Sequence, residues 1–241
     1  MTQSLNAQEW GNIYNQDQLN TVISEVRSPG LQSEWTRELL RITNPGDRVL
    51  EIGSGSGQTS LCLAKAGREV TALDYSESAL NLITSAAQAL SINLRTVLHN
   101  AHTALPFKEN EFDVIFHAGL LEHFEISQRT EMLRLWKPYG KKMVSMVPNA
   151  ASLCYRLGKE SLENSGGWKW MKEDPAYTQI GEFLSAGYTV EREYTIDMAS
   201  SLYFMEEGAL KETLSRLWSD RQAQGLTDLF HQGYLLVTVG V

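Results

Sequence analysis

Val49–Gly57 reads Val-Leu-Glu-Ile-Gly-Ser-Gly-Ser-Gly, a short apolar run that ends in three alternating glycines. Leu50 and Ile52 are typical of a strand buried on both faces, and a helical pattern resumes at Gln58. A strand that turns directly into a helix needs backbone at positive φ, which glycine adopts without a Cβ penalty. The free N–H groups that begin the next helix then form a polar floor. The stretch therefore predicts a cofactor site at the end of a central strand.

The spacing of the glycines distinguishes this turn from the dinucleotide fingerprint. That fingerprint is G-x-G-x-x-G, whereas here the third glycine comes one residue earlier and an acidic residue precedes the first glycine. The segment resembles motif I of the class I S-adenosylmethionine (SAM) dependent methyltransferases, E/D-x-G-x-G-x-G. The resemblance implies that SAM is bound by Glu51, Gly53, Ser54, Gly55 and Gly57. The alternative is a tight turn without a ligand.

A second acidic residue ends the next expected strand, residues 69–74. Ser76 then begins a helix. Ligands of open α/β sheets bind at the carboxyl ends of strands, and a carboxylate there accepts hydrogen bonds from both ribose hydroxyls. In the family this is the motif II acid, so the resemblance assigns Asp74 to the ribose and Tyr75 to the same site. Alternatively, Asp74 only caps the helix.

The loop after the third expected strand, residues 94–98, carries the expected adenine contacts. The family usually has Asp-Ala a few residues before Leu-Pro-Phe, and this chain has Asn100 and Ala101 before the same tripeptide. An asparagine oxygen can accept the same adenine N–H as an aspartate. The resemblance thus assigns adenine recognition to Asn100 and to the backbone N–H of Ala101, with a polar surface loop as the alternative.

Two histidines border the loop after the fourth expected strand, residues 112–116, where methyltransferases of this type place the methyl acceptor. Either ring could take a proton from an acceptor, or be structural, so His123 and His117 are the catalytic candidates. His117 is also expected at the cofactor through its backbone carbonyl. Glu122-His123 resembles the Glu-His of small-molecule methyltransferases, including quinone-biosynthesis O-methyltransferases. Some of these bind a metal through an acid three positions earlier, where this chain has Gly119, so we expect no metal site.

The two ends of the chain carry less specific signals. Residues 1–44 have apolar groups at helical spacing, and we expect these N-terminal helices to cover the cofactor site. Trp10 and Tyr14 would then contact the cofactor, although aromatic residues at helical spacing are also common in cores. Residues 45–241 would form the SAM-binding domain.

Two insertions interrupt that domain, at about 149–175 and 200–231. We expect them to shape the acceptor pocket, and the apolar insertion at 149–175 could equally be a dimer contact. Asp174-Pro175-Ala176-Tyr177 predicts the start of a helix over 177–186. A sixth strand is expected at 187–194 and the last at 234–239.

Composition limits the possible partners. The chain has 241 residues, 42% hydrophobic and 21% charged, which suits one α/β domain. Its formal net charge of −8 argues against nucleic acid, because binding there depends on lysine and arginine neutralising phosphates. The two cysteines form no metal or disulfide pattern. The first residues show neither the basic nor the apolar run typical of a signal peptide, and we expect no membrane span. We expect a cytoplasmic monomer or homodimer that does not bind membranes.

The resemblance and the element order together predict a doubly wound, mostly parallel seven-stranded α/β sheet. N-terminal helices and a helical lid insertion would be added to it, and the last strand would be antiparallel beside the sixth. The expected activity is methyl transfer from SAM to an O, N or C atom of a small metabolite, with S-adenosylhomocysteine as product. Two alternatives remain open: a protein or peptide methyltransferase, which needs an open groove, and a non-catalytic SAM-binding protein.

Overall fold

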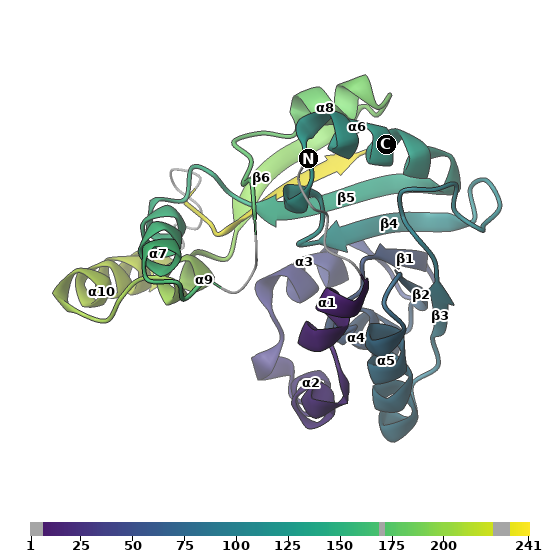
Figure 1. The fold of residues 1–241 in the computed structure, drawn as a ribbon, viewed down its shortest axis with the longest axis horizontal. Helices are drawn as coiled ribbons and strands as arrows, with labels where there is room; N and C mark the ends of the chain where they lie inside the picture. Colours follow the sequence, from purple (N-terminus) through teal and green to yellow (C-terminus); the bar gives the residue numbers. More distant parts are fainter. Residues whose placement is uncertain (1–6, 169–171, 224–231) are drawn as a thin grey trace.

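The structure, a computed structural model, describes residues 7–168, 172–223 and 232–241. They form one seven-stranded sheet with the order β3-β2-β1-β4-β5-β7-β6 (Figure 1). The strands are β1 (Arg48–Ile52), β2 (Glu69–Asp74), β3 (Arg95–Leu98), β4 (Phe112–Ala118), β5 (Gly140–Pro148), β6 (Val190–Ile196) and β7 (Leu235–Gly240). Neighbouring strands are parallel except that β7 runs antiparallel to both β5 and β6. The predicted sheet, including its antiparallel last strand, is confirmed.

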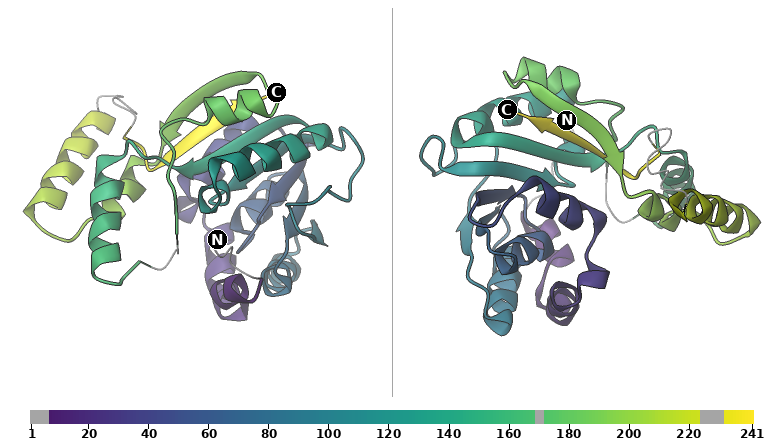
Figure 2. Two further views of the ribbon diagram at one scale, coloured as in Figure 1. Left: turned by 45° about the horizontal axis from the view of Figure 1, so that its top comes forward. Right: turned by 180° about the vertical axis from the view of Figure 1, so that it is seen from behind.

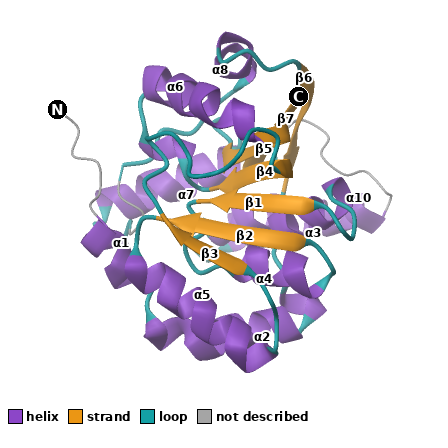
Figure 3. Cartoon of the chain, turned by 90° about the vertical axis from the view of Figure 1, so that its right-hand side faces the viewer, coloured by secondary structure: helices purple, strands orange, loops and turns teal. Residues whose placement is uncertain are grey.

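Helices cover both faces of the sheet (Figure 3). They are α1 (Ala7–Ile13), α2 (Leu19–Arg27), α3 (Glu34–Ile42), α4 (Gln58–Lys65), α5 (Glu77–Leu90), α6 (Ile126–Trp136), α7 (Leu153–Asn164), α8 (Ile180–Ser185), α9 (Met198–Tyr203) and α10 (Ala209–Ala223). Short 3-10 turns are η1 (Gln16–Gln18), η2 (Pro29–Leu31), η3 (Leu121–His123) and η4 (Lys137–Tyr139). In the described part of the chain, every helix is too short or too polar to cross a membrane.

The central strand β1 is buried on both faces. Leu50 belongs to the core formed with α6 and α8, while Val49 belongs to the core formed with α3 and α4. Successive side chains of a strand point to opposite faces, so two apolar neighbours require a covered sheet on each side. This double burial fixes the glycine turn in the middle of the carboxyl edge of the sheet.

A separate helical layer lies beyond the carboxyl end of β5, away from α3, α4 and α5 (Figures 1 and 2). It consists of α7, α9 and α10, which share a small apolar core around Cys154, Leu202 and Met205. These helices contain most of the two predicted insertions. Residues 169–171 and 224–231 of those insertions lie outside the described residues. The role of the insertions at the acceptor pocket stays a prediction.

The helix expected to begin at Tyr177 was placed too early in the chain. The backbone before it is paired elsewhere: Ala176 N–H donates to the carbonyl of Pro148 at 3.0 Å, and Asp174 N–H donates to that of Glu122 at 2.8 Å. Ala176 also pairs with Asn149 in a β-bridge, and Gln179 N–H donates to Oε2 of Glu193 at 2.8 Å, so the chain is not yet helical at these positions and α8 begins at Ile180. The segment connects the end of β5 with the loop after β4.

Gly57 provides a test of the turn geometry. It lies at φ 67°, and a Cβ built on it would be 2.3 Å from Cγ1 of Ile83 in α5. We expect Gly57→Ala to lower the free energy of unfolding by about 2–4 kcal/mol, because the left-handed backbone and the overpacking are both unfavourable. Urea unfolding monitored by circular dichroism measures this loss.

Gly46 is the matched control, because it lies at φ 88° with no described atom within 4 Å of a built Cβ. Gly46→Ala isolates the backbone contribution and should cost only about 1–2 kcal/mol. Equal losses in the two variants would mean that Ile83 relaxes freely and that close packing under the turn is unimportant.

Candidate active site

The glycine turn between β1 and α4 forms one wall of a pocket at the carboxyl edge of the sheet. Gly53, Gly55 and Gly57 lie at φ 71°, 50° and 67°, which explains why glycine occupies alternate positions. The hydroxyl of Ser54 is buried and has no hydrogen-bond partner among the described residues. Buried polar atoms are normally paired, so this hydroxyl indicates a ligand that lies against the turn.

Asp74 ends β2 next to the glycine turn and is buried. Its Oδ2 accepts a hydrogen bond from Gly55 N–H at 2.9 Å, and its Oδ1 accepts one from Ser76 N–H at 2.8 Å. Burial raises the pKa of Asp74 above its usual range, although these backbone bonds oppose the shift. Each carboxylate oxygen has a further lone pair, so Asp74 can still accept hydroxyl groups from a ligand.

Glu51 is the second buried acid at the turn. The hydroxyl of Ser60 in α4 donates to its carboxylate. Desolvation raises the pKa of Glu51 to about 8, opposed by Ser60 and reinforced by the charge of Asp74. Two buried acids at the turn favour a ligand that brings positive charge and hydroxyl groups.

The pocket has a volume of about 270 Å³ and lies where β1, β2 and β4 end. Its walls come from α1, α3, the glycine turn, the loops after β2 and β4, and the start of β7. The lining residues are Trp10, Tyr14, Trp35, Glu51, Gly53, Ser54, Gly55, Ser56, Gln58, Thr59, Asp74, Tyr75, Ala118, Gly119, Leu120, Glu122, His123, Glu173, Tyr234 and Leu235.

Helix α1 and the residue that follows it lie over this pocket. A Cβ built on Gly55 would be 3.0 Å from Cζ of Tyr14, so the phenol ring covers the turn. The ring of Trp10 stacks on that of Tyr14 with centroids 5.9 Å apart, and its edge contact with His123 has centroids 5.3 Å apart. Burial raises the pKa of Tyr14 to about 12, which keeps it neutral. One short helix thus contacts both ends of the pocket.

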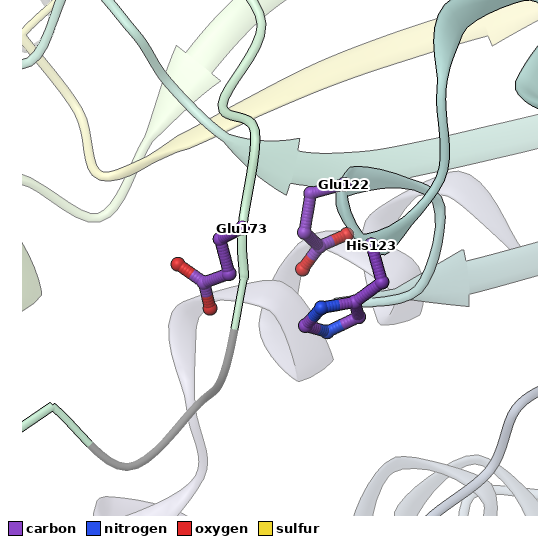
Figure 4. A group of neighbouring side chains, drawn as sticks. All are labelled: Glu122, His123 and Glu173. Atoms are coloured by element: carbon purple, nitrogen blue, oxygen red, sulfur yellow. The ribbon is translucent and has the colours of Figure 1, made fainter. Parts of the chain in front are cut away.

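Two carboxylates and an imidazole meet in the wall of the same pocket (Figure 4). Glu122 and His123 belong to η3, whereas Glu173 comes from the loop before α8. One ligand-capable atom of each lies within 4.8 Å of the others. Desolvation raises the pKa of Glu122 to about 8 and that of Glu173 to about 7, and it lowers the pKa of His123.

Arg129 of α6 fastens together the two segments that carry these groups. Its Nε donates to the carbonyl of Phe124 at 2.8 Å, and its Nη2 donates to the carbonyl of Asp174 at 2.8 Å. Its side chain is only 2% exposed, and these bonds satisfy part of its donor set. Glu173 is thereby held beside Glu122, although the two are distant in sequence.

The side chains of the cluster are also fixed individually. The hydroxyl of Tyr155 donates to Oε2 of Glu173 at 2.9 Å. Nδ1 of His123 lies 3.0 Å from the carbonyl oxygen of Lys172. A carbonyl only accepts, so this contact places the ring proton on Nδ1 and leaves the lone pair on Nε2.

The structure brings most of the predicted site residues together in the pocket. They are Tyr14, Glu51, Gly53, Ser54, Gly55, Asp74, Tyr75 and His123. Gly57 lies beneath the turn against Ile83 and has a conformational role.

The predicted adenine residues do not line the pocket. The side chain of Asn100 accepts a hydrogen bond from His102 N–H at 3.0 Å, and the carbonyl of Ala101 accepts one from Nε1 of Trp136 at 2.8 Å. Their loop is nevertheless anchored at the site, because His99 N–H donates to the carbonyl of Asp74 at 2.9 Å. Their contact with adenine stays a prediction.

His117 does not occupy the position that a catalytic side chain requires. Its ring is fully buried, with Nε2 2.7 Å from the hydroxyl of Ser145 and its centroid 6.0 Å from that of Trp136 in α6. Desolvation lowers its pKa to about 3. Alternation along β4 turns this ring into the core, so it cannot take a proton from an acceptor in the pocket.

Glu173 and Tyr234 are two of the lining residues that sequence reasoning missed. Glu173 belongs to no motif and stands just before the tetrapeptide that indicated a helix start. Tyr234 immediately precedes the last strand. The one usable signal for Glu173 was its place in an insertion after a central strand, where pocket residues often lie.

Comparison with known proteins agrees with this geometry. Residues 49–140 match a family model described as a methyltransferase domain. A demethylmenaquinone methyltransferase from Oceanobacillus iheyensis is 26% identical over 203 residues, which cover 73% of this chain and 84% of the relative. One from Bacillus cereus is 30% identical over 149 residues, but the match spans only 59% of this chain and 61% of that relative.

Solved structures show the same fold. A SAM-dependent methyltransferase from Methanosarcina mazei has a TM-score of 0.59 at 16% identity, with 84% of this chain and 95% of that chain covered. Magnesium protoporphyrin IX methyltransferase from Synechocystis, solved with bound S-adenosylhomocysteine, has a TM-score of 0.55 at 16% identity, covering 99% and 88% of the two chains.

Residues 49–140 thus match a methyltransferase domain, and the fold is that of solved SAM-dependent methyltransferases. The cofactor that this similarity implies is SAM. The turn fits SAM: its glycines adopt positive φ, the hydroxyl of Ser54 lacks a partner among the described residues, and Asp74 has free lone pairs. Glu51 adds a buried acid suited to a cationic ligand.

Asp74→Ala should weaken the binding of SAM and of S-adenosylhomocysteine roughly 10- to 150-fold, because it removes charge-assisted hydrogen bonds worth about 1.5–3 kcal/mol. Isothermal calorimetry measures both affinities, and circular dichroism verifies folding. Glu77→Ala is the control, since Glu77 is exposed in the first turn of α5. Unchanged affinity in a folded Asp74 variant would place the ribose contact elsewhere.

Glu51 predicts a specific pH dependence of stability. Its pKa in the folded protein is about 8, against 4.5 for the unperturbed group, so the folded state retains a proton that the unfolded state has lost. The stability that this retained proton gives the folded protein is complete below pH 4.5 and is lost as the pH rises to about 8. Glu51→Gln should therefore gain stability relative to wild type across this window, by at most about 1.4 kcal/mol per pH unit. Urea unfolding at several pH values tests this, and a pH-independent difference would contradict it.

Proposed function

We propose that this chain transfers a methyl group from SAM to a small molecule bound at the Glu122, His123 and Glu173 end of the pocket. The supporting observation is that the glycine turn and this ionisable cluster line the same pocket. When bound, SAM supplies a methyl group on a positively charged sulfur, which makes that methyl electrophilic. The protein's part is to orient the acceptor and to promote the loss of its proton.

The lining of the pocket indicates the kind of acceptor. Trp10, Tyr14 and Tyr234 offer aromatic surface, and Leu120 adds an aliphatic contact. The cluster provides the polar end of the pocket. This pattern favours a largely apolar small molecule with one ionisable hydroxyl or amine group. The demethylmenaquinone methyltransferase relatives also favour a small-molecule acceptor.

A protein or peptide acceptor is less well supported. Helix α1 lies across the pocket, with Trp10 in contact with both Tyr14 and His123. A polypeptide would need an open groove at this position. The net charge of −8 likewise disfavours nucleic acid, and we propose that the protein works as a monomer or homodimer.

His123 is the residue on which loss of the acceptor proton depends. The contact of Nδ1 with the carbonyl of Lys172 orients the ring and leaves a lone pair on Nε2. His123 lines the pocket, whereas the ring of His117 lies in the core and is not part of this proposal.

The activity is tested by incubating the purified protein with SAM and a metabolite extract. Mass spectrometry should detect metabolites heavier by one methyl group together with S-adenosylhomocysteine. The Asp74→Ala variant serves as the control with impaired cofactor binding. Methylated peptides without small-molecule products would favour a protein methyltransferase, and SAM binding without any product would favour a non-catalytic protein.

His123→Gln should lower kcat by roughly 10²- to 10⁴-fold while leaving SAM affinity nearly unchanged, because the side chain contributes at the acceptor end. Steady-state kinetics with an identified acceptor and calorimetry with SAM measure the two effects. His102→Gln is the matched control, since His102 makes an edge contact with Phe124 of the same loop but does not line the pocket. Wild-type kcat in His123→Gln would leave His123 with a structural role.

A further inference from the structure

We propose that Glu122, His123 and Glu173 form a binding site for a divalent metal cation. One carboxylate oxygen from each glutamate and one histidine nitrogen lie within 4.8 Å of one another, and Figure 4 shows them converging from two segments of the chain. Two carboxylates and one imidazole suit Mn²⁺, Fe²⁺ or Mg²⁺ better than a softer metal. Cation binding itself does not depend on the proposed function, but the role of the cation in methyl transfer does.

An independent observation is that one carboxylate oxygen of the cluster has no hydrogen-bond partner among the described residues. Glu122 is 2% exposed, and its Oε2 has no hydrogen-bond partner in the described part of the chain. A buried carboxylate oxygen without a partner is costly unless a ligand satisfies it. The nearby guanidinium of Arg129 donates to Phe124 and Asp174 and lies 3.7 Å from Glu182, so its direct contacts are made elsewhere.

The ligand groups are already held in place by a surrounding set of contacts. Tyr155 donates a hydrogen bond to Glu173, and the carbonyl of Lys172 contacts Nδ1 of His123. Histidine ligands of metals usually donate their second N–H to such a carbonyl or to a carboxylate. Because these side chains are fixed beforehand, binding a cation costs little ordering entropy.

Glu173 supplies the acid that the loop after β4 lacks. The expectation of no metal site depended on Gly119, which occupies the position of an acid in some related enzymes. Gly119 instead leaves room for Glu122: a Cβ built on it would be 3.4 Å from Oε1 of that residue. The third ligand thus comes from a different segment, which the spacing within the loop could not reveal.

A cation held by three protein groups retains open coordination positions for an acceptor oxygen. Binding there would lower the pKa of an acceptor hydroxyl. The O–H bond breaks, the proton passes to water, and the electron pair stays on the oxygen as the nucleophile. His123 then acts as a ligand of the cation rather than as a free base. This deepens the proposed function by specifying an acceptor that carries an ionisable hydroxyl group.

Titration of chelator-treated protein with Mn²⁺ alone tests the site without any turnover. Electron paramagnetic resonance of free Mn²⁺ should report one bound ion per chain. Glu173→Gln and Glu122→Gln should each weaken binding at least about tenfold. Glu125→Gln is the matched control: its carboxylate is on the same loop but faces Nζ of Lys172, and binding should stay at the wild-type level.

Absence of saturable Mn²⁺ binding in wild-type protein would overturn the site. So would equal Mn²⁺ affinities in wild-type protein and in folded Glu173→Gln, a variant that remains informative if the buried Glu122 variant does not fold. Full methyl transfer in chelator-treated protein would overturn the role of the cation while leaving the proposed function intact. Stoichiometric Mn²⁺ binding without methyl transfer would support the site and count against the proposed function.

Discussion

The positive φ angles of Gly53, Gly55 and Gly57 are the constraint on which the rest of the site depends. They let β1 turn into α4 within a few residues and bring two buried acids, Glu51 and Asp74, to the wall of one pocket. Hydrogen bonding of Gly55 N–H to Asp74 ties this turn to β2, so the cofactor end is built from two neighbouring strands. Glu122, His123 and Glu173 line the same pocket as this turn.

The fold and the cofactor end could be predicted from sequence because their signals are local. A buried strand, alternating glycines and an acid at the next strand end are each encoded within a few residues, and parallel topology brings them together. The antiparallel last strand followed from the family resemblance. Boundaries were less accurate: β6 begins at Val190 rather than at 187, because Gly187 at φ 92° and the buried Tyr188 belong to the turn after α8.

The acceptor end could be predicted only in part because its contacts are distant in sequence. His123 was predicted from a local motif. Glu173 lies beside it because Arg129 bonds to both loops that carry these residues, and no local sequence pattern encodes those bonds. His117 was misplaced for a related reason. Residue type and proximity to the loop suggested catalysis, whereas alternation along β4 and the packing of Trp136 decide that its ring is buried in the core.

Arg129 joins two segments, and only one of them lies inside the stretch that matches the family model. The stretch that matches the methyltransferase family ends at residue 140, yet Glu173 completes the polar end of the pocket from beyond it. The recognisable domain is therefore smaller than the working pocket. The segment after β5 is held to the loop after β4 by Arg129 and by the hydrogen bond from Asp174 N–H to the carbonyl of Glu122. Substitutions in the segment after β5 can therefore alter the wall of the pocket at Glu173 without changing any residue of the glycine turn.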